Sequence, residues 1–331
     1  MNQKSLGCHI ALVALTLFLT TPHSVAQNKP AWLPMQIIDV GGMPWEPMWT
    51  GLRGTSRGKK LYSNDQGGFM LYLEHDHGWD SPNKARHFHD FHEWGYVLRG
   101  NFLIYEFINA RQTKGSLYNM KAGTWMSRPP FSIHGHRADA MDHQRITPGA
   151  VQLAFSEGGK TYSLDPTNKW FSPDWQRFTD FTFAHFQDTA TPQIMEWEDD
   201  EQLPGASVKW LSDDYANGFR AKLVYVPPEW QYTGDSHASY FEKAQQFYYV
   251  LSGDLVVGIQ EQPGVNVVEK QTVYKDFFIN RPAKSLWVWT EGALSTRGAM
   301  WLEVTYAEGA QKGKGPIGEA IDASKEQSKR K

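Results

Sequence analysis

The chain has 331 residues, of which 40% are hydrophobic and 21% are charged. This composition excludes a disordered polymer and a fibrous repeat, and it allows a sizeable buried core. The formal net charge of -3 offers no basic surface for a phosphate backbone, so we expect no nucleic-acid partner. The only cysteine is Cys8, so a mature chain that begins after it has no disulfide, cysteine nucleophile or thiolate metal site.

The first 26 residues have the anatomy of a signal peptide. Lys4 supplies a positive charge, residues 10–19 form an apolar run, and Ser24-Val25-Ala26 offers small residues for cleavage. The run ends before Pro22, well short of the roughly 20 apolar residues that span a bilayer. We therefore expect a periplasmic or secreted protein with no membrane attachment after cleavage.

The remaining chain contains an internal repeat. The segment Tyr96-Val97-Leu98-Arg99-Gly100 resembles Tyr249-Val250-Leu251-Ser252-Gly253, an offset of 153 residues from position 96 to position 249. The same offset aligns further landmarks without an insertion: Met70-Leu71-Tyr72 with Leu223-Val224-Tyr225, Trp125 with Phe278, Arg128 with Arg281, and Pro129 with Pro282. A constant offset over such a distance indicates two copies of one structural unit.

Strand-like segments dominate both copies. They are short, rich in aromatic and β-branched residues, and separated by Gly, Pro, Asn and Asp: residues 69–73, 96–107, 151–155, 250–259 and 301–306. Long helical periodicity is nearly absent, so the chain is predicted to be all-β, with two barrels or sandwiches in tandem.

The repeat also predicts the domain boundaries. The first copy is expected over 27–165 and the second over 204–310. Residues 166–203 read as an ordered connector with one short helix near Pro173 to Asp180. The charged residues 311–331 are predicted to form a solvated, flexible tail.

Potential metal ligands concentrate in the first copy. His87 and His89 lie two residues apart, so on a strand both imidazoles point to one face, and Glu93 follows with the same parity. His134 follows the Pro129-Pro130 turn and could close the site from another strand. Imidazoles with a carboxylate suit Fe, Mn, Co, Ni, Cu or Zn, and the residues alone do not choose among these metals.

These residues resemble the two motifs of the cupin family. His87, His89 and Glu93, followed by six residues and Gly100, match the first motif. The second motif is matched by Gly123, five residues, Pro129 and later His134. Phe131 stands in place of that motif's glycine and Ala138 in place of its asparagine. With the repeat, the chain resembles a bicupin over residues 68–155 and 221–306.

The resemblance implies two jelly-roll (double-stranded β-helix) barrels, the first binding a metal through His87, His89, Glu93 and His134. His136 is a rival fourth ligand, because it has the same parity, although the motif spacing favours His134. If His136 is not a ligand, it is a candidate catalytic acid or base. Six further histidines are expected to be surface residues or satisfied polar groups: His75, His77, His92, His143, His185 and His237.

The second copy lacks this ligand set. At the same offset the four positions hold Tyr240, Glu242, Gln246 and Trp287, which cannot replace three imidazoles. We therefore predict that the second barrel binds no catalytic metal and serves packing, substrate shaping or formation of a homodimer.

The resemblance to cupin dioxygenases implies an oxidoreductase that acts on a small oxygen-chelating organic substrate, with Fe(II) the favoured metal and Mn, Ni, Cu or Zn as alternatives. The same site could instead serve an isomerase or lyase as a Lewis acid. A third hypothesis is a non-catalytic protein that binds a small molecule or a metal, because one fold can carry several functions.

Overall fold

The computed structural model describes residues 32–50, 54–76, 86–135, 149–166, 171, 188–214, 219–233, 237–260, 268–289, 292–307 and 320–322. The predicted signal peptide and the short helix expected near residues 173–180 lie outside these ranges. The described residues form β-strands and one 3-10 helix, Pro192–Ile194 (η2), and contain no α-helix, which confirms the all-β prediction. No helix among them has the length and hydropathy needed to cross a bilayer.

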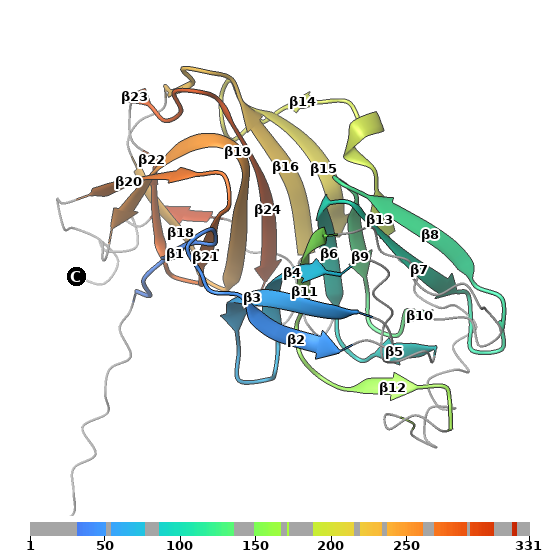
Figure 1. Cartoon of the computed structure of the whole chain (residues 1–331). Coiled ribbons are helices and arrows are strands. Elements are labelled where there is room, and N and C mark those ends of the chain that lie inside the picture. Colours follow the sequence, from blue (N-terminus) through green and yellow to red (C-terminus); the bar gives the residue numbers. More distant parts are fainter. Residues whose placement is uncertain are drawn as a thin grey trace, which may run out of the picture. The chain divides into compact units, whose positions relative to one another are not determined.

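Two antiparallel sheets form the first barrel (Figure 1). The seven-stranded sheet has the order β13-β9-β6-β11-β4-β3-β2, and the five-stranded sheet has the order β12-β5-β10-β7-β8. The strands of both sheets are Glu46–Thr50 (β2), Thr55–Ser63 (β3), Phe69–His75 (β4), His87–His89 (β5), Glu93–Arg99 (β6), Asn101–Phe107 (β7), Ser116–Lys121 (β8), Trp125–Arg128 (β9), Ile133–Gly135 (β10), Ala150–Ser156 (β11), Thr161–Ser163 (β12) and Asp188–Ala190 (β13).

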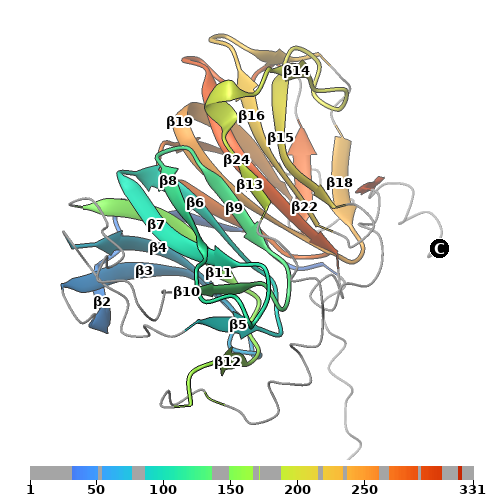
Figure 2. The same ribbon diagram turned by 90° about the vertical axis from the view of Figure 1, so that its right-hand side faces the viewer.

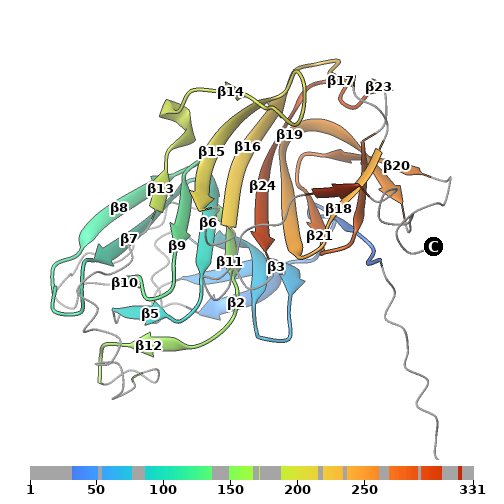
Figure 3. The ribbon, with the colours of Figure 1, turned by 180° about the vertical axis from the view of Figure 1, so that it is seen from behind.

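The second barrel is built on an eleven-stranded sheet and a two-stranded one, β17-β23. In the larger sheet β15, β16, β24 and β19 lie side by side, as Figures 1 and 3 show. The strands are Gln36–Asp39 (β1), Glu198–Asp199 (β14), Ser207–Asp214 (β15), Phe219–Val226 (β16), Gln231–Tyr232 (β17), His237–Phe241 (β18), Ala244–Gln260 (β19), Glu269–Tyr274 (β20), Phe277–Arg281 (β21), Leu286–Trp289 (β22), Gly292–Ala293 (β23), Ala299–Ala307 (β24) and Ala320–Asp322 (β25).

Strand pairing follows the repeat. In the first barrel Glu93 lies opposite Arg128, and in the second Gln246 lies opposite Arg281, each 153 positions further on. The chain turns at Gly100 with φ 76° and passes Gly253 with φ 75° in the same left-handed conformation, which glycine adopts without steric cost. Figure 2 shows β6 and β7 as separate strands, whereas their counterpart β19 is continuous.

One buried cluster joins the two barrels. Trp94 stacks on Phe155 with ring centroids 5.4 Å apart, and Phe155 contacts Phe247 at 5.5 Å and Tyr306 at 5.1 Å. All four belong to a single hydrophobic core with residues from both copies. Because these aromatic rings bury a large apolar area, the contact contributes strongly to stability.

Four segments depart from the expected boundaries, since β13 and β14, within the predicted connector, pair with β9 and β15. β1 lies within the range assigned to the first barrel, yet it pairs with β21 in the second. β25 lies within the predicted tail, yet Tyr240 of β18 pairs with its Ile321. The reason in each case is an open strand edge, whose unpaired backbone groups accept another segment of the chain.

Candidate metal centre in the first barrel

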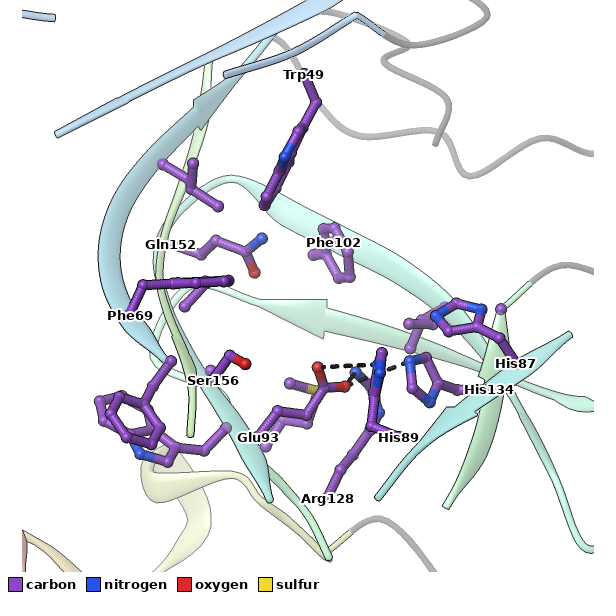
Figure 4. Close-up of a pocket in the computed structure, with 18 residues that line it drawn as sticks. Trp49, Phe69, His87, His89, Glu93, Phe102, Arg128, His134, Gln152 and Ser156 are labelled. Atoms are coloured by element: carbon purple, nitrogen blue, oxygen red, sulfur yellow. Dashed lines mark hydrogen bonds and ion pairs between the residues drawn. The ribbon is translucent and has the colours of Figure 1, made fainter. Parts of the chain in front are cut away.

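Three histidines converge inside the first barrel (Figure 4). His87 and His89 lie on β5, and His134 on β10 is the register partner of His87. One ring nitrogen from each lies within 4.8 Å of the others. Phe88, between the two β5 histidines, is buried in a hydrophobic cluster on the other face. Strand alternation therefore directs both imidazoles to one side, as the sequence predicts.

Hydrogen bonds orient two of the imidazoles. Nδ1 of His134 donates to the carbonyl oxygen of Ser132 at 3.1 Å. Nδ1 of His89 lies 2.9 Å from the hydroxyl oxygen of Thr161 on β12. In both rings Nε2 is then the nitrogen that faces Glu93. Such a partner on the outer nitrogen is the usual way in which a protein orients a metal-binding histidine.

The electrostatic environment keeps these imidazoles neutral. Burial lowers the pKa of His89 to about 4, although Glu93 acts in the opposite direction. Burial, followed by the charge of Arg128, holds the pKa of His134 well below its usual range. A neutral imidazole has the free lone pair that a metal requires, so the donor set fits a divalent transition metal.

Glu93 lies beside the three histidines and is held by a buried arginine. Its carboxylate oxygens lie 3.5 Å from Nε2 of His89 and 3.4 Å from Nε2 of His134. Arg128 Nη1 donates to Oε1 of Glu93 at 2.5 Å, and Arg128 Nε donates to Glu106 at 2.9 Å. Burial favours protonation of Glu93, but its coupling to His89 and the charge and hydrogen bond of Arg128 outweigh this effect and lower its pKa. Glu93 is therefore ionised and available to a cation.

Glu106 completes a buried carboxylate–arginine–carboxylate chain. Burial raises the pKa of Glu106 to about 7, although Arg128 opposes the shift. The pKa of Arg128 is raised, because Glu106 and Glu93 together outweigh the burial that would lower it. Arg128 thus stays charged between two carboxyl groups. Of the two, Glu93 is well stabilised as an anion and Glu106 is not.

The turn before His134 keeps a left-handed residue, although phenylalanine replaces the glycine of the motif at that position. Phe131, in place of the motif's glycine, has φ 70°, and Lys284 in the second copy has φ 64°. A residue with a Cβ costs about 1–2 kcal/mol in this region. Phe131 lies against Phe88, with ring centroids 6.1 Å apart, and this packing offsets part of the cost. His136, the candidate acid or base, lies outside the described residues.

In the second barrel, the positions that correspond to the four candidate ligands hold residues that pack against, or bond to, other parts of the protein. Tyr240 and Trp287 are buried, and Trp287 stacks on Tyr248 with centroids 5.0 Å apart. Oε1 of Gln246 accepts hydrogen bonds from Arg281 Nη1 and from the hydroxyl of Tyr248, both at 2.7 Å. Glu242 pairs with Lys284 at 2.8 Å near the surface. The amide of Gln246 is therefore engaged within the protein rather than presented to an ion.

A cavity of about 190 Å³ opens next to the histidines. The metal-ligand candidates line one part of it, and Figure 4 shows an aromatic group elsewhere, formed by Trp49, Phe69 and Phe102. Gln152 and Ser156 on β11 add polar groups to the wall. The result is a mostly apolar pocket with a few directed polar groups, the usual composition of a small-molecule site.

Sequence reasoning missed three groups of this site. Arg128 was visible only as a landmark of the repeat, and Glu106 gave no signal except that Ile259 replaces it in the second copy. Gln152 belongs to a predicted strand but to neither motif. The roles of these three residues depend on neighbours across the sheet, such as Glu93 opposite Arg128. Such pairs form only when the strands are folded together.

Comparisons with known proteins identify the fold. No protein-family model matches the chain, and no curated protein matches it. A dioxygenase candidate from Nostoc punctiforme is similar in structure with a TM-score of 0.57 and 13% identity, covering 87% of this chain and 86% of that one. Oxalate decarboxylase of Lactobacillus farciminis, in a formate complex, is similar with a TM-score of 0.53 and 13% identity, covering 88% of this chain and 90% of that one.

Protein Ylba of E. coli is also similar, with a TM-score of 0.52 and 10% identity over 83% of this chain and 91% of that one. At such identities the likeness concerns the fold. It confirms two cupin-like barrels in tandem, the architecture that the repeat and the motifs predict.

Proposed function

We propose that this chain is a metal-dependent oxidoreductase of the dioxygenase type, acting on a small organic substrate that presents two oxygen atoms to the metal. The observation that supports it most is the convergence of three imidazoles, those of His89 and His134 with lowered pKa values, beside an ionised Glu93 in a pocket. His87, His89, His134 and Glu93 would hold the ion, whose contribution is Lewis acidity and redox chemistry. Fe(II) is the favoured metal of the proposal.

The other residues act on the environment of the reacting groups. Arg128 holds the carboxylate of Glu93 toward the histidines through the 2.5 Å hydrogen bond. The apolar walls formed by Phe69, Phe102 and Phe155 exclude water from the substrate. Exclusion of water strengthens the electrostatic interactions inside the pocket and suppresses side reactions.

Oxygen consumption tests the proposal. Protein purified without added ions would first be analysed for its metal content. The metal would then be removed, and separate samples of the apo-protein would be loaded with Fe(II), Mn, Ni, Cu or Zn. Oxygen uptake would then be measured with β-diketone, catechol and flavonol substrates. We expect uptake with a redox-active metal, loss of uptake in His87→Ala, and normal uptake in Gln246→Ala. Stoichiometric metal without oxygen uptake on any substrate would contradict the dioxygenase proposal and favour Lewis-acid chemistry.

We also propose that the protein is exported and acquires its metal outside the cytoplasm. The supporting observation is the sequence of residues 1–26, with its charged start, apolar run and small residues before Gln27. The intact mass of protein recovered from the periplasm or medium should correspond to a chain that begins at Gln27. Full-length protein confined to the cytoplasm would contradict this proposal.

A further inference from the structure

The cavity extends beyond the candidate metal ligands into a small aromatic compartment. Trp49, Phe69 and Phe102 surround this part of the wall, and Figure 4 shows the amide of Gln152 among their rings. The cavity volume of about 190 Å³ is close to that of engineered cavities of about 150 Å³ that bind benzene. This volume is sufficient for one aromatic ring with small substituents.

Gln152 is held in one orientation by a buried histidine. Its Nε2 donates to Nε2 of His75 at 3.1 Å. Burial lowers the pKa of His75 to about 4, so the ring is neutral at physiological pH and its Nε2 can accept this bond. The amide nitrogen of Gln152 is thereby turned toward His75, and the opposite end of the amide is its carbonyl oxygen.

The carbonyl oxygen of Gln152 faces the pocket. Gly95, which also lines the cavity, lies beside this oxygen: a Cβ placed on Gly95 would be 3.9 Å from Gln152 Oε1 and 3.1 Å from Cε of Met126. Among the hydrogen bonds of the described residues, the amide of Gln152 makes only the one to His75. An oriented acceptor in an apolar wall favours a ligand with a hydrogen-bond donor at that point, because an unmatched polar group there costs binding energy.

We propose that the pocket selects a single-ring aromatic substrate with a hydroxyl or amino donor on the ring side remote from the metal, read by Gln152 Oε1. The inference rests on the proposed function, because it takes the chelating oxygens of the same ring to be at the metal. Trp49, Phe69 and Phe102 receive the ring, and His75 acts as a positioning residue for Gln152.

Ligand binding to zinc-loaded protein tests this without turnover, since zinc has no redox chemistry. Calorimetry would compare 4-(hydroxymethyl)catechol, which can donate a hydrogen bond, with 4-(methoxymethyl)catechol and 4-ethylcatechol, which cannot donate from the substituent. We expect the hydroxymethyl compound to bind about 5-fold more tightly than either. In Gln152→Met this preference should disappear, while in Gln66→Met, a substitution at an exposed turn outside the pocket, it should persist.

A matched pair of tryptophan variants tests the role of the aromatic residues in the proposal. Trp49 and Trp197 are similarly exposed, at 39% and 41%, but only Trp49 is among the residues that line the cavity. Trp49→Leu should weaken binding of all three catechols by about 5-fold or more with unchanged zinc content, and Trp197→Leu should have no effect. Equal losses in the two variants would overturn this part.

The outcomes separate the two proposals. Tighter binding of the methoxymethyl compound, or a hydroxymethyl preference that survives in Gln152→Met, overturns the role of Gln152 and leaves the metal centre intact. Stoichiometric zinc with no binding of any catechol overturns the chelating mode of the proposed function, and the inference with it. Absence of zinc binding contradicts the metal centre itself.

Discussion

Arg128 links the candidate metal ligands to the rest of the first barrel. It is 4% exposed and joins Glu93 to Glu106, so one buried cation lies between two carboxyl groups. Taking one member out of a buried ion pair costs about 3–5 kcal/mol, because the remaining charge has no partner. Arg281 occupies the same register in the second barrel but faces the neutral Gln246. The arginine belongs to both copies, and only its carboxylate partners are particular to the first.

Replacement of Arg128 should weaken metal binding without removing a ligand. In Arg128→Met we expect metal affinity to fall about 10–100-fold, as for other groups that orient a ligand. Arg128→Lys should restore part of the affinity, because it keeps the charge but not the two-sided hydrogen bonding. Competition with a chelator would measure the affinities. Arg281→Met is the matched control, and an equal loss of affinity there would show that Arg128 acts only through general stability.

Glu157 is a deeply buried carboxyl group outside the pocket. It is 1% exposed and accepts a hydrogen bond from the backbone nitrogen of His92 at 3.0 Å. Burial raises its pKa to about 8, although the His92 bond acts in the opposite direction. The unfolded chain releases this proton near pH 4.5, whereas the folded chain keeps it up to about pH 8. Stability therefore decreases as pH rises across this interval.

Glu157→Gln should remove this dependence. At one pKa unit per 1.36 kcal/mol, the Glu157 contribution to the free energy of unfolding should fall by on the order of 3 kcal/mol between pH 5.5 and 8. In the variant this component should be absent, so the variant should gain stability relative to wild type at pH 8. Chemical denaturation at several pH values measures the difference. Parallel pH profiles for wild type and variant would refute the assignment, and the exposed Glu198→Gln serves as control.

At the level of elements, β1 connects the two barrels. Its Gln36 side chain accepts a hydrogen bond from Asn280 on β21 at 2.9 Å. Just after the strand, Val40 is buried and its carbonyl accepts from Lys59 Nζ on β3 at 2.7 Å. The segment therefore contacts both barrels, although the sequence assigns it to the first.

Removal of β1 should destabilise the whole molecule. A chain that begins at Gly42 loses the β1–β21 pairing and the burial of Met35 and Val40, and we expect its free energy of unfolding to fall by on the order of 4 kcal/mol relative to a chain that begins at Trp32. Urea denaturation would compare the two. Identical midpoints would mean that β1 is an accessory strand with no effect on the core.

The middle of the strand plan could be predicted from the sequence because the repeat keeps its spacing there, whereas the pairing shifts it in the outer strands: Ala154 lies between Leu71 and Gly95, and its equivalent Glu303, 149 residues on, lies between Lys222 and Tyr248. Strands β8 and β20 begin at residues 116 and 269, and β9 and β21 end at residues 128 and 281, each pair at the predicted offset. β1 and β25 could not be predicted, since short strands at an open edge have no period of their own. The motif spacing predicted that His87, His89 and His134 lie close together, and they do. The positions of Arg128, Glu106 and Gln152 could not be predicted, because they become neighbours of the site only through pairing between strands that are distant in the sequence.

At the scale of the whole molecule, the shared core predicts joint unfolding. Trp94 and Phe155 of the first barrel pack in one cluster with Phe247 and Tyr306 of the second, and the hydroxyl of Tyr306 lies 2.9 Å from Nδ1 of His92. Neither barrel can lose these contacts without exposing the other. Calorimetry of the metal-free protein should therefore show one transition, and two well-separated transitions would indicate barrels that fold independently.

The most direct test of the account is the number of metal ions per chain. Three imidazoles and Glu93 are present in the first barrel, whereas Tyr240, Gln246 and Trp287 fill the equivalent positions of the second. Elemental analysis of reconstituted protein should give one transition-metal ion per chain, none in His87→Ala, and still one in Gln246→Ala. Two ions per chain, or a metal content that is unchanged in His87→Ala, would contradict the assignment of a single metal centre to the first barrel.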